Sequence, residues 1–334
     1  MLEFLKNNPL VEGARSARLR PRGMATCFLI FLAVMTVTEM VASLPASMYA
    51  TLRIFSVLGA GVFLNPDADA DALAEEMNAA YAAVMAEDGY ILTSLFSMLA
   101  VALLVIVFCR FIERRPISSM GLSVRRGFLA EYGIGLFAGL LLAGLTFLLL
   151  YATHAVSVTA GSFSGGMLLL YLLAFLIQGA AEEILLHGYF MISLTATARP
   201  LSAAIYSSLL FSLLHVGNVG TSVLSILNVF LFGLLLGLIT FRTGSLALAC
   251  ALHGIWNFAE GNLFGLPVSG ILPGHSLLAS TLDEGRALTN GGAFGPEGGA
   301  VVTLVLLLAF AVFFLLPQKK WEQPAAESFG EEQR

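Results

Sequence analysis

Residues 128–153 read FLAEYGIGLFAGLLLAGLTFLLLYAT and carry a single charged side chain, Glu131. A helix crosses roughly 30 Å of hydrocarbon with about 20 consecutive apolar residues. This stretch is long enough and apolar enough to do so. It therefore predicts a membrane-spanning helix, and it sets the fold class of the chain around it.

The rest of the chain has the same character. Of 334 residues, 58% are apolar and 12% are charged, and the mean hydropathy is +0.87. Soluble domains carry about 25% charged residues. The composition therefore excludes a cytosolic enzyme, a secreted disulfide scaffold and a disordered chain, and the net charge of -5 argues against a nucleic-acid partner. Cys27, Cys109 and Cys250 lack CxxC spacing and are interpreted as small buried apolar side chains.

Eight segments meet the length criterion for a span. They are residues 24–44, 90–109, 128–153, 167–195, 201–216, 222–241, 245–264 and 300–317. With both termini in the cytoplasm, this topology places 15 of the 17 Lys and Arg residues inside, the excess that cytoplasmic loops carry. A further apolar stretch, 47–64, would be a ninth span or an interfacial segment. As a span it would move the basic loop 110–126 outside, so we reject it as a span.

The predicted fold class is an all-α polytopic membrane protein with about eight transmembrane helices and cytoplasmic N- and C-termini. We expect a basic cytoplasmic tail at 1–23, a single membrane domain at 24–317 and a polar cytoplasmic tail at 318–334. The membrane domain includes two external segments, 64–89 and 265–299.

The two external segments differ in composition. In the first, Leu73, Met77, Tyr81 and Val84 recur at helical spacing, which indicates a short amphipathic helix; the alternative is a solvated loop that spaces two spans. The second is rich in glycine and is expected to be a long loop.

Ionisable side chains within spans are functional candidates because each costs about 2.5 to 3.5 kcal/mol at the centre of a helix. The candidates are Glu39, Glu182, Glu183, His187, His215 and His253, with the uncharged Asn257 beside the last. Three neighbouring spans carry most of them.

The fourth span contains QGAAEEILLHGYF at residues 178–190. Adjacent residues on a helix point about 100° apart, so Glu182 and Glu183 cannot do the same work. His187 lies four residues after Glu183 and on its face. We therefore expect Glu183 to pair with His187 and Glu182 to face an interior cavity. The alternative is that both carboxylates sit protonated at a cytoplasmic helix end.

The fifth and seventh spans add two more polar faces. FSLLHVGN places Phe211 and His215 on one face, and ALHGIWNF places His253 and Asn257 on one face. A lone histidine in a membrane usually makes a helix-to-helix hydrogen bond. Because these side chains arrive from neighbouring spans together with a Glu pair, the sequence predicts a site.

These residues match a family pattern. EEILLHG, FSLLH and HGIWN resemble the EExxxR, FxxxH and HxxxN motifs of the CPBP intramembrane proteases, the CAAX prenyl protease and bacteriocin-processing family. The order and spacing agree across residues 182–257. One position departs from the pattern, because His187 stands where the family usually has Arg. Unlike Arg, a histidine is largely neutral at pH 7 unless its pKa is raised, so a permanent charge partner for Glu183 is not assured.

The resemblance implies a membrane endopeptidase, a hydrolase in which a glutamate activates water. It assigns Glu182 as general base, His215 as the residue that holds and polarises the water, and His253 and Asn257 as hydrogen-bond donors to the oxyanion. A desolvated carboxylate suits general-base work, and preorganised donors contribute about 3 to 4 kcal/mol each. The expected partners are membrane lipid and a membrane-associated protein or peptide substrate, without a cofactor, in the plasma membrane if the source is bacterial.

Three alternatives stay open. Glu182, His215 and His253 would make a three-ligand zinc site and hence a metalloendopeptidase, although HExxH is absent. A proton-coupled transporter would use Glu39, Glu182 and Glu183 as a relay. A catalytically silent membrane scaffold or immunity protein could share the fold.

Depth within the membrane tests whether the motifs can converge. At 1.5 Å per residue, Glu182 should lie about 22 Å from the outer face, in the inner half, as should His253. His215, counted from residue 201, comes out in the outer half. Either the fifth span begins below the membrane or runs tilted, so that the three side chains can meet, or the assignment of these residues to one site is wrong.

Overall fold

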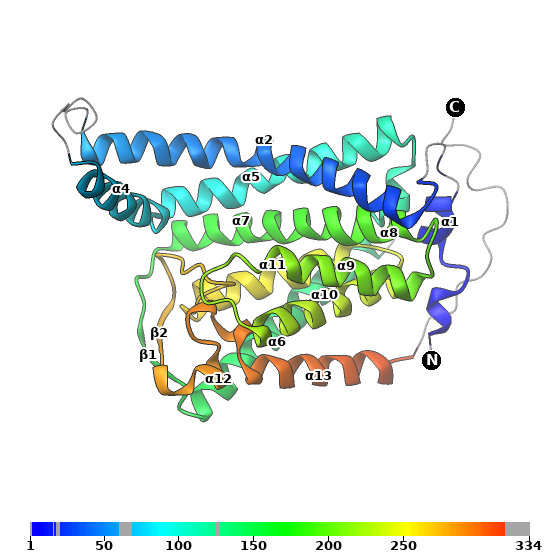
Figure 1. Cartoon of the computed structure of the whole chain (residues 1–334). Coiled ribbons are helices and arrows are strands. Elements are labelled where there is room, and N and C mark those ends of the chain that lie inside the picture. Colours follow the sequence, from blue (N-terminus) through cyan, green and yellow to red (C-terminus); the bar gives the residue numbers. More distant parts are fainter. Residues whose placement is uncertain (1, 16, 18–20, 60–68, 125–126, 318–334) are drawn as a thin grey trace.

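Apolar helices coincide with the predicted spans in the computed structural model, which describes residues 2–15, 17, 21–59, 69–124 and 127–317 (Figure 1). They are α2 (Met24–Leu58), α5 (Asp88–Val107), α6 (Phe128–Ala152), α7 (Gly165–Glu183), α9 (Pro200–Leu214), α10 (Val223–Thr243), α11 (Ala247–Phe258) and α13 (Ala300–Leu315).

Five helices in the described part of the chain are long and apolar enough to cross a membrane. They are α2, α5 with its extension to Ile112, α6, α7 with its extension to Leu194, and α10. The predicted class, an all-α polytopic membrane protein, is confirmed. Crossing of the membrane by α9, α11 and α13, and so the count of eight spans, stays a prediction.

Shorter elements join these helices. They are α1 (Pro9–Arg15), α4 (Ala70–Met85), α8 (Ile192–Leu194), α12 (Ala287–Asn290), the π-helices η2 (Phe108–Ile112), η4 (Ile184–Met191) and η5 (Ala259–Leu263), the 3₁₀ turns η1 (Glu3–Leu5), η3 (Ile117–Met120), η6 (Glu284–Arg286), η7 (Gly292–Phe294) and η8 (Pro296–Gly298), and the strands β1 (Val156–Ala160) and β2 (Leu278–Leu282).

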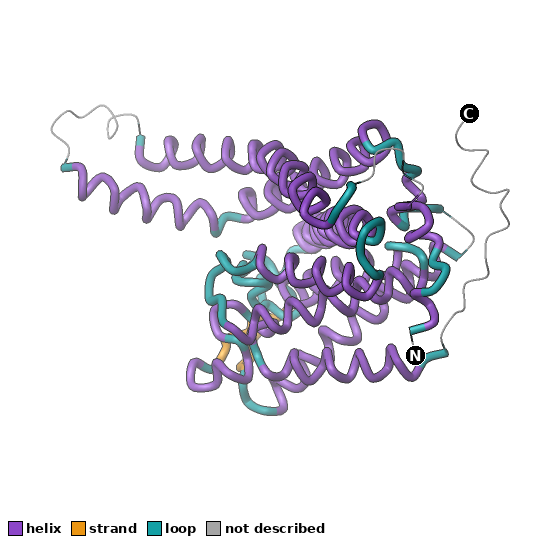
Figure 2. The backbone as a smooth tube through the Cα atoms, turned by 45° about the vertical axis from the view of Figure 1, so that its right-hand side comes forward, coloured by secondary structure: helices purple, strands orange, loops and turns teal. Residues whose placement is uncertain are grey.

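Helix α2 continues through Pro45 for 35 residues, about 52 Å at 1.5 Å per residue. Residues 47–58 are thus neither a ninth span nor a separate interfacial segment, because they prolong the first helix; residues 60–64 of that stretch lie outside the described residues. The far half of α2 and the adjacent α4 project beyond the other helices (Figures 1 and 2).

Helix α4 confirms the helical reading of the segment before α5. Asp69 caps its N-terminus by accepting a hydrogen bond from the Asp71 backbone. Of the four apolar residues that suggested its buried face, Val84 is buried, whereas Met77 and Tyr81 are exposed. Helical spacing therefore predicted the element but only part of its packing face.

An ion pair anchors this projecting arm. Glu87, between α4 and α5, accepts from the Arg53 guanidinium at 2.7 Å and from the Tyr49 hydroxyl at 2.7 Å. The hydrogen bond from Arg53, followed by that from Tyr49, lowers the pKa of Glu87 to about 2. The carboxylate is therefore charged over the physiological pH range.

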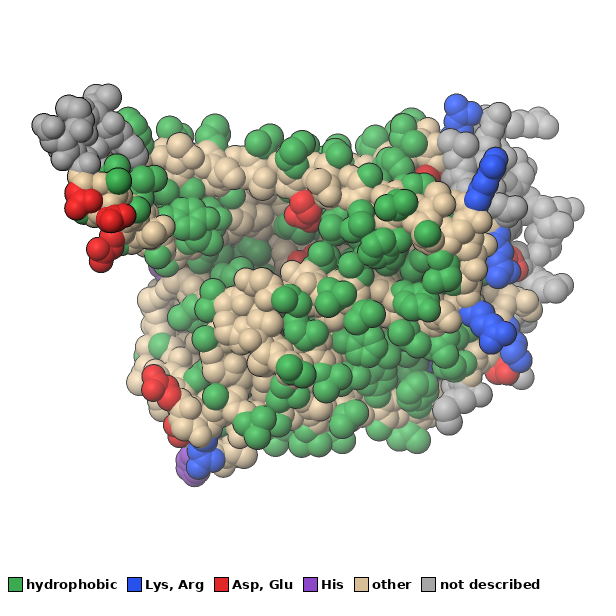
Figure 3. Space-filling model, in the orientation of Figure 1, with side chains coloured by type: hydrophobic (Ala, Val, Ile, Leu, Met, Phe, Trp, Pro, Cys, Tyr) green, Lys and Arg blue, Asp and Glu red, His purple; other side chains and the backbone are tan. Residues whose placement is uncertain are grey.

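Charges separate between the two ends of the molecule. On the face shown in Figure 3, most Lys and Arg side chains lie at one end, with some acidic side chains among them, and acidic side chains predominate at the other end. The basic end also holds η1 and the end of α13, where the Phe4 and Phe313 rings lie 5.8 Å apart. Such asymmetry is what a fixed orientation across a membrane requires.

The stretch 265–299, expected to be a long loop, contains β2, α12 and three 3₁₀ turns. Strand β2 pairs antiparallel with β1, with Val156 opposite Leu282 and Ala160 opposite Leu278. A five-residue strand whose partner lies more than a hundred residues away has no local periodicity that predicts it. The pairing fastens this stretch across one end of the helices.

Helix α11 lies at the centre of the core, where it packs against α6 and α7 (Figure 1). A Cβ on Gly179 of α7 would lie 2.7 Å from the Gly254 nitrogen of α11, and a Cβ on Gly254 would lie 2.8 Å from the Leu176 Cα. Only glycine permits so close an approach of two helix backbones. The crossing brings the Glu pair, three residues after Gly179, beside the residues that flank Gly254.

Candidate active site

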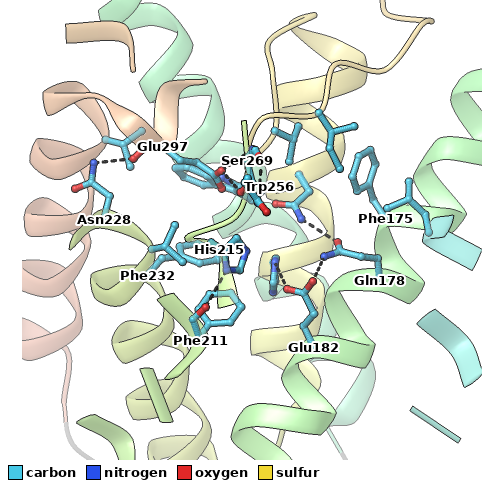
Figure 4. Close-up of a pocket in the computed structure, with 18 residues that line it drawn as sticks. Phe175, Gln178, Glu182, Phe211, His215, Asn228, Phe232, Trp256, Ser269 and Glu297 are labelled. Atoms are coloured by element: carbon cyan, nitrogen blue, oxygen red, sulfur yellow. Dashed lines mark hydrogen bonds and ion pairs between the residues drawn. The ribbon is translucent and has the colours of Figure 1, made fainter. Parts of the chain in front are cut away.

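A cavity of about 110 Å³ lies where α7, α9, α10 and α11 meet (Figure 4). Its wall includes the predicted residues Glu182, Phe211, His215, His253 and Asn257. Three motifs that are far apart in the sequence thus contribute to one cavity. Glu183 and His187 are fully buried and are not part of its wall.

Glu182 is the carboxylate that faces the cavity. Its Oε1 accepts a hydrogen bond from Gln178 Nε2 at 2.6 Å. Its Oε2 lies 3.7 Å from His253 Nε2 and has no hydrogen-bond partner among the described residues. Oε1 is thus fixed by Gln178, and Oε2 is a buried acceptor beside the cavity that no described residue satisfies with a hydrogen bond.

Glu183 lies behind the cavity and bridges two histidines. The predicted partner is present, with His187 Nδ1 donating to Glu183 Oε2 at 2.7 Å. A second donor, His253 Nδ1, lies 2.9 Å from Glu183 Oε1. The helical spacing revealed the first contact but not the second, which joins α7 to α11 across 70 residues.

The bridge fixes the orientation of the His253 ring. Because Nδ1–H points at Glu183, Nε2 points toward Glu182 and the cavity. The ring lies edge-on between Phe211, at 5.9 Å, and Phe232, at 5.4 Å. A buried carboxylate opposite Nδ1 holds the imidazole in place and stabilises the positive charge that the ring acquires when Nε2 takes a proton.

His215 ends α9 and is oriented by its own helix. Its Nδ1 donates to the Phe211 carbonyl oxygen at 2.8 Å, and the Phe211 ring lies edge-on to it at 4.9 Å. Nδ1–H is thus occupied, so Nε2 carries a lone pair that can accept a hydrogen bond from water.

Asn257 is linked to Glu182 through a residue that the sequence analysis missed. Asn257 Nδ2 donates to Gln178 Oε1 at 2.9 Å, and Gln178 in turn donates to Glu182. Gln178 lies four residues before Glu182, so the helical spacing that paired Glu183 with His187 could also have found it. One of the two Asn257 amide hydrogens stays available to the cavity.

Two further acids were overlooked. Glu260 lies within the predicted span 245–264 and is fully buried; it follows His253 by seven residues and so shares its helix face, a pattern that could have revealed it. Glu297 belongs to the stretch 265–299, and it lines the cavity together with Ser269. No local pattern in the sequence places Glu297 near Glu182.

The helix lengths explain how the motifs reach one depth. Helix α7 continues through η4 and α8 to Leu194, about 18 Å beyond Glu182, and α9 returns about 22 Å from Pro200 to His215. The prediction that His215 lies in the outer half and Glu182 in the inner half was therefore wrong, because both side chains line the same cavity. The error arose from assigning both helices the thickness of the hydrocarbon, which α7 with its extension exceeds.

The zinc alternative finds limited support in the geometry. Glu182, His215 and His253 supply donor types that suit zinc. Within the described residues, however, no three His, Cys, Asp or Glu side chains are gathered closely enough to hold one metal ion. The residues present thus do not form a preassembled metal site.

Glu39 of α2 does not line the cavity. In the described part of the chain no hydrogen bond connects it to Glu182 or Glu183, although it is close enough to Glu182 for their charges to interact. The geometry therefore contains no hydrogen-bonded carboxylate relay from Glu39.

Comparison with known protein families finds a match in the part of the chain that contains the three motifs. Residues 164–259 match the family model Rce1-like, type II CAAX prenyl endopeptidase Rce1-like. No significant match was found among curated proteins or among solved structures. The matched residues include all three motifs, from Glu182 to Asn257, and end before Ser269 and Glu297. The resemblance of this chain to the CPBP intramembrane proteases is thus confirmed over residues 164–259, which match the Rce1-like family model.

Proposed function

We propose that the protein is an intramembrane endopeptidase that hydrolyses peptide bonds in membrane-associated proteins or peptides with a glutamate-activated water. The observation that carries the proposal is that the two adjacent carboxylates, Glu182 and Glu183, have different surroundings. Glu182 lines the cavity and keeps one carboxylate oxygen without a hydrogen-bond partner among the described residues, whereas both oxygens of Glu183 accept hydrogen bonds from histidines.

The first step requires a water between Glu182 and His215. Glu182 Oε2 takes a proton from the water, while His215 Nε2 accepts a hydrogen bond from the water's second hydrogen. The resulting hydroxide attacks the carbonyl carbon of the peptide bond. The unpartnered Glu182 oxygen and the orientation of the His215 ring support these roles.

The attack places negative charge on the carbonyl oxygen. Asn257 Nδ2 donates its second hydrogen to this oxyanion, and a His253 ring that already carries a proton on both nitrogens before the attack donates from Nε2. The contact of His253 Nδ1 with the Glu183 carboxylate supports this role, because the carboxylate stabilises the charged ring. Glu182 then returns its proton to the leaving nitrogen as the carbon–nitrogen bond breaks.

The eight-span topology, cytoplasmic termini and a plasma-membrane location in a bacterial source belong to the same proposal. It assigns no cofactor and no nucleic-acid partner. Membrane lipid supplies the surroundings in which a membrane-associated substrate would meet the cavity.

The experiment that tests the proposal compares three versions of the chain expressed in otherwise identical membranes. Wild type, Glu182→Gln and the control Glu75→Gln, which alters an exposed carboxylate on α4, are compared by mass spectrometry of protein termini. Peptide termini that occur with wild type and with the control, and disappear with Glu182→Gln, are the expected result. Identical termini in all three samples would instead favour a silent scaffold of the same fold.

A further inference from the structure

The cavity continues beyond the catalytic motifs to a wall formed by the stretch 265–299. Glu297, within η8, and Ser269 lie on this wall together with Trp256 of α11, across the cavity from Glu182 (Figure 4). The family match ends at residue 259, so the part of this wall formed by Ser269 and Glu297 lies outside the matched residues, whereas Trp256 lies within them. That part of the wall is therefore a place where this chain can differ from others with the same motifs.

The Glu297 side chain is held in position by Ser269. The Ser269 backbone nitrogen and hydroxyl donate to Glu297 Oε2 at 2.9 and 2.5 Å. Ser269 has a φ of 46°, a left-handed conformation that is uncommon for a residue other than glycine and that its partners must stabilise. Asn218 of the pocket wall adds a third contact by donating from Nδ2 to the Ser269 carbonyl oxygen at 3.0 Å.

The backbone of Glu297 is fixed as well. Its carbonyl oxygen accepts from Asn228 Nδ2 at 2.8 Å, and Asn228 is itself buried and accepts from Thr303 at 2.7 Å. The other carboxylate oxygen of Glu297, Oε1, has no hydrogen bond to a described residue, and Glu297 lines the cavity.

Apart from the two histidines, His215 and His253, the ionisable side chains on the cavity wall are acidic. Among the described residues that line the cavity, Glu182 and Glu297 are acidic, and none is Lys or Arg. Next to Glu297 the wall is aromatic, with the Phe232 and Trp256 rings 5.4 Å apart. A carboxylate on a ligand would meet like charge here, whereas a cation would meet a carboxylate of opposite charge beside aromatic rings.

We infer that Glu297 and the aromatic wall form a subsite for a positively charged group of the substrate, an ammonium or a guanidinium, and that Glu297 is the specificity-determining residue. This inference rests on the proposed function, since it describes the substrate of the same cavity. Three sources share the required chemistry: a Lys side chain, an Arg side chain and a free amino terminus.

A binding experiment tests the subsite without any need for hydrolysis. The chain contains two tryptophans, Trp256 and Trp321, so a Trp321→Phe background leaves Trp256 in the cavity wall as the fluorescent reporter. The protein also carries Glu182→Gln, which removes the other carboxylate and prevents turnover. The probes are n-butylammonium for Lys, n-butylguanidinium for Arg, alaninamide for an amino terminus, and butyrate as the anionic control.

At least one cationic probe should bind about tenfold more tightly than butyrate, the effect of one charge-assisted hydrogen bond. Glu297→Gln should abolish this preference, Glu297→Lys should reverse it, and the exposed control Glu284→Gln should leave it unchanged. The probe that binds best identifies the source of the cation. Equal binding of butyrate and all cations, or a preference that survives Glu297→Gln, would overturn the inference.

Two further comparisons keep the results interpretable. Gln retains an acceptor oxygen for Ser269, so the melting temperature of Glu297→Gln should be close to that of the parent protein. If it is much lower, the binding of the four probes to the parent protein still decides the charge preference. Cation binding without any Glu182-dependent cleavage would refute the proposed function and leave the subsite intact. Cleavage without a cation preference would refute the subsite alone.

Discussion

Glu182 and Glu183 offer a matched pair of substitutions, because Glu→Gln is the same chemical change at adjacent positions. Glu182→Gln should remove the general base and slow cleavage at least about 100-fold. It should leave the free energy of unfolding within about 1 kcal/mol of wild type, since Gln at this position can still accept from Gln178.

Glu183→Gln should act on stability instead. The carboxylate accepts two ring N–H groups, at 2.7 Å from His187 and 2.9 Å from His253, and it is fully buried. Hydrogen bonds to a charged group contribute about 1.5 to 3 kcal/mol each. Gln keeps one acceptor oxygen and turns an amide N–H toward the other ring, so one bond is lost. The expected loss is therefore about 2 to 3 kcal/mol.

The assay measures unfolding midpoints and cleavage for both variants in the same detergent. Glu182→Gln should be inactive with a melting temperature near that of wild type, and Glu183→Gln should melt several degrees lower. If Glu182→Gln cleaves while Glu183→Gln does not, the roles are reversed. Equal melting temperatures for the two variants would refute the bridge between the two histidines.

Three other predictions concern the helix crossing, the projecting arm and metal. Gly179→Ala should push α7 away from α11 and lower both stability and cleavage, because the new Cβ would lie 2.7 Å from the Gly254 backbone nitrogen. The control is Gly144→Ala, whose Cβ has open space around it. This control should leave the melting temperature unchanged or raise it. Because the Arg53 contact lowers the Glu87 pKa from 4.5 to about 2, the arm should be held above pH 4.5 and released as the pH falls toward 2. Spin-label distances between α2 and α4 would register the release, and Glu87→Gln should make the distance independent of pH. Cleavage should survive dialysis against a chelator with less than one zinc per chain; a tightly bound zinc whose removal abolishes activity and whose return restores it would assign a metal mechanism.

The parts of this structure that follow from local chemistry could be predicted from the sequence. Apolar length sets the helices, and a spacing of four residues pairs Glu183 with His187. Nothing local links His253 to Glu183, because that contact depends on how closely α7 and α11 cross. Gln178 and Glu260 lie at helical spacing from Glu182 and His253, so the sequence could have predicted them as neighbours of the site.

The cavity wall at Ser269 and Glu297 could not be predicted in the same way. Both residues lie in a glycine-rich stretch whose path is set by turns and by a distant strand. Turn chemistry of this kind places side chains through backbone angles that sequence periodicity does not encode. The sequence alone therefore did not predict Glu297 as a second acidic residue in the cavity wall.

The pairing of β1 with β2 has a consequence for the order of folding. The two strands enclose the residues from Ala160 to Leu278, which include every catalytic motif. Contacts between residues so far apart form late, because the intervening chain must first lose its conformational freedom. During synthesis, helices through α11 can already carry Glu182 and His253 before β2 exists. The wall containing Ser269 and Glu297 closes only when the last helices have been made, so a growing chain holds the hydrolytic groups without the surface that would select a substrate.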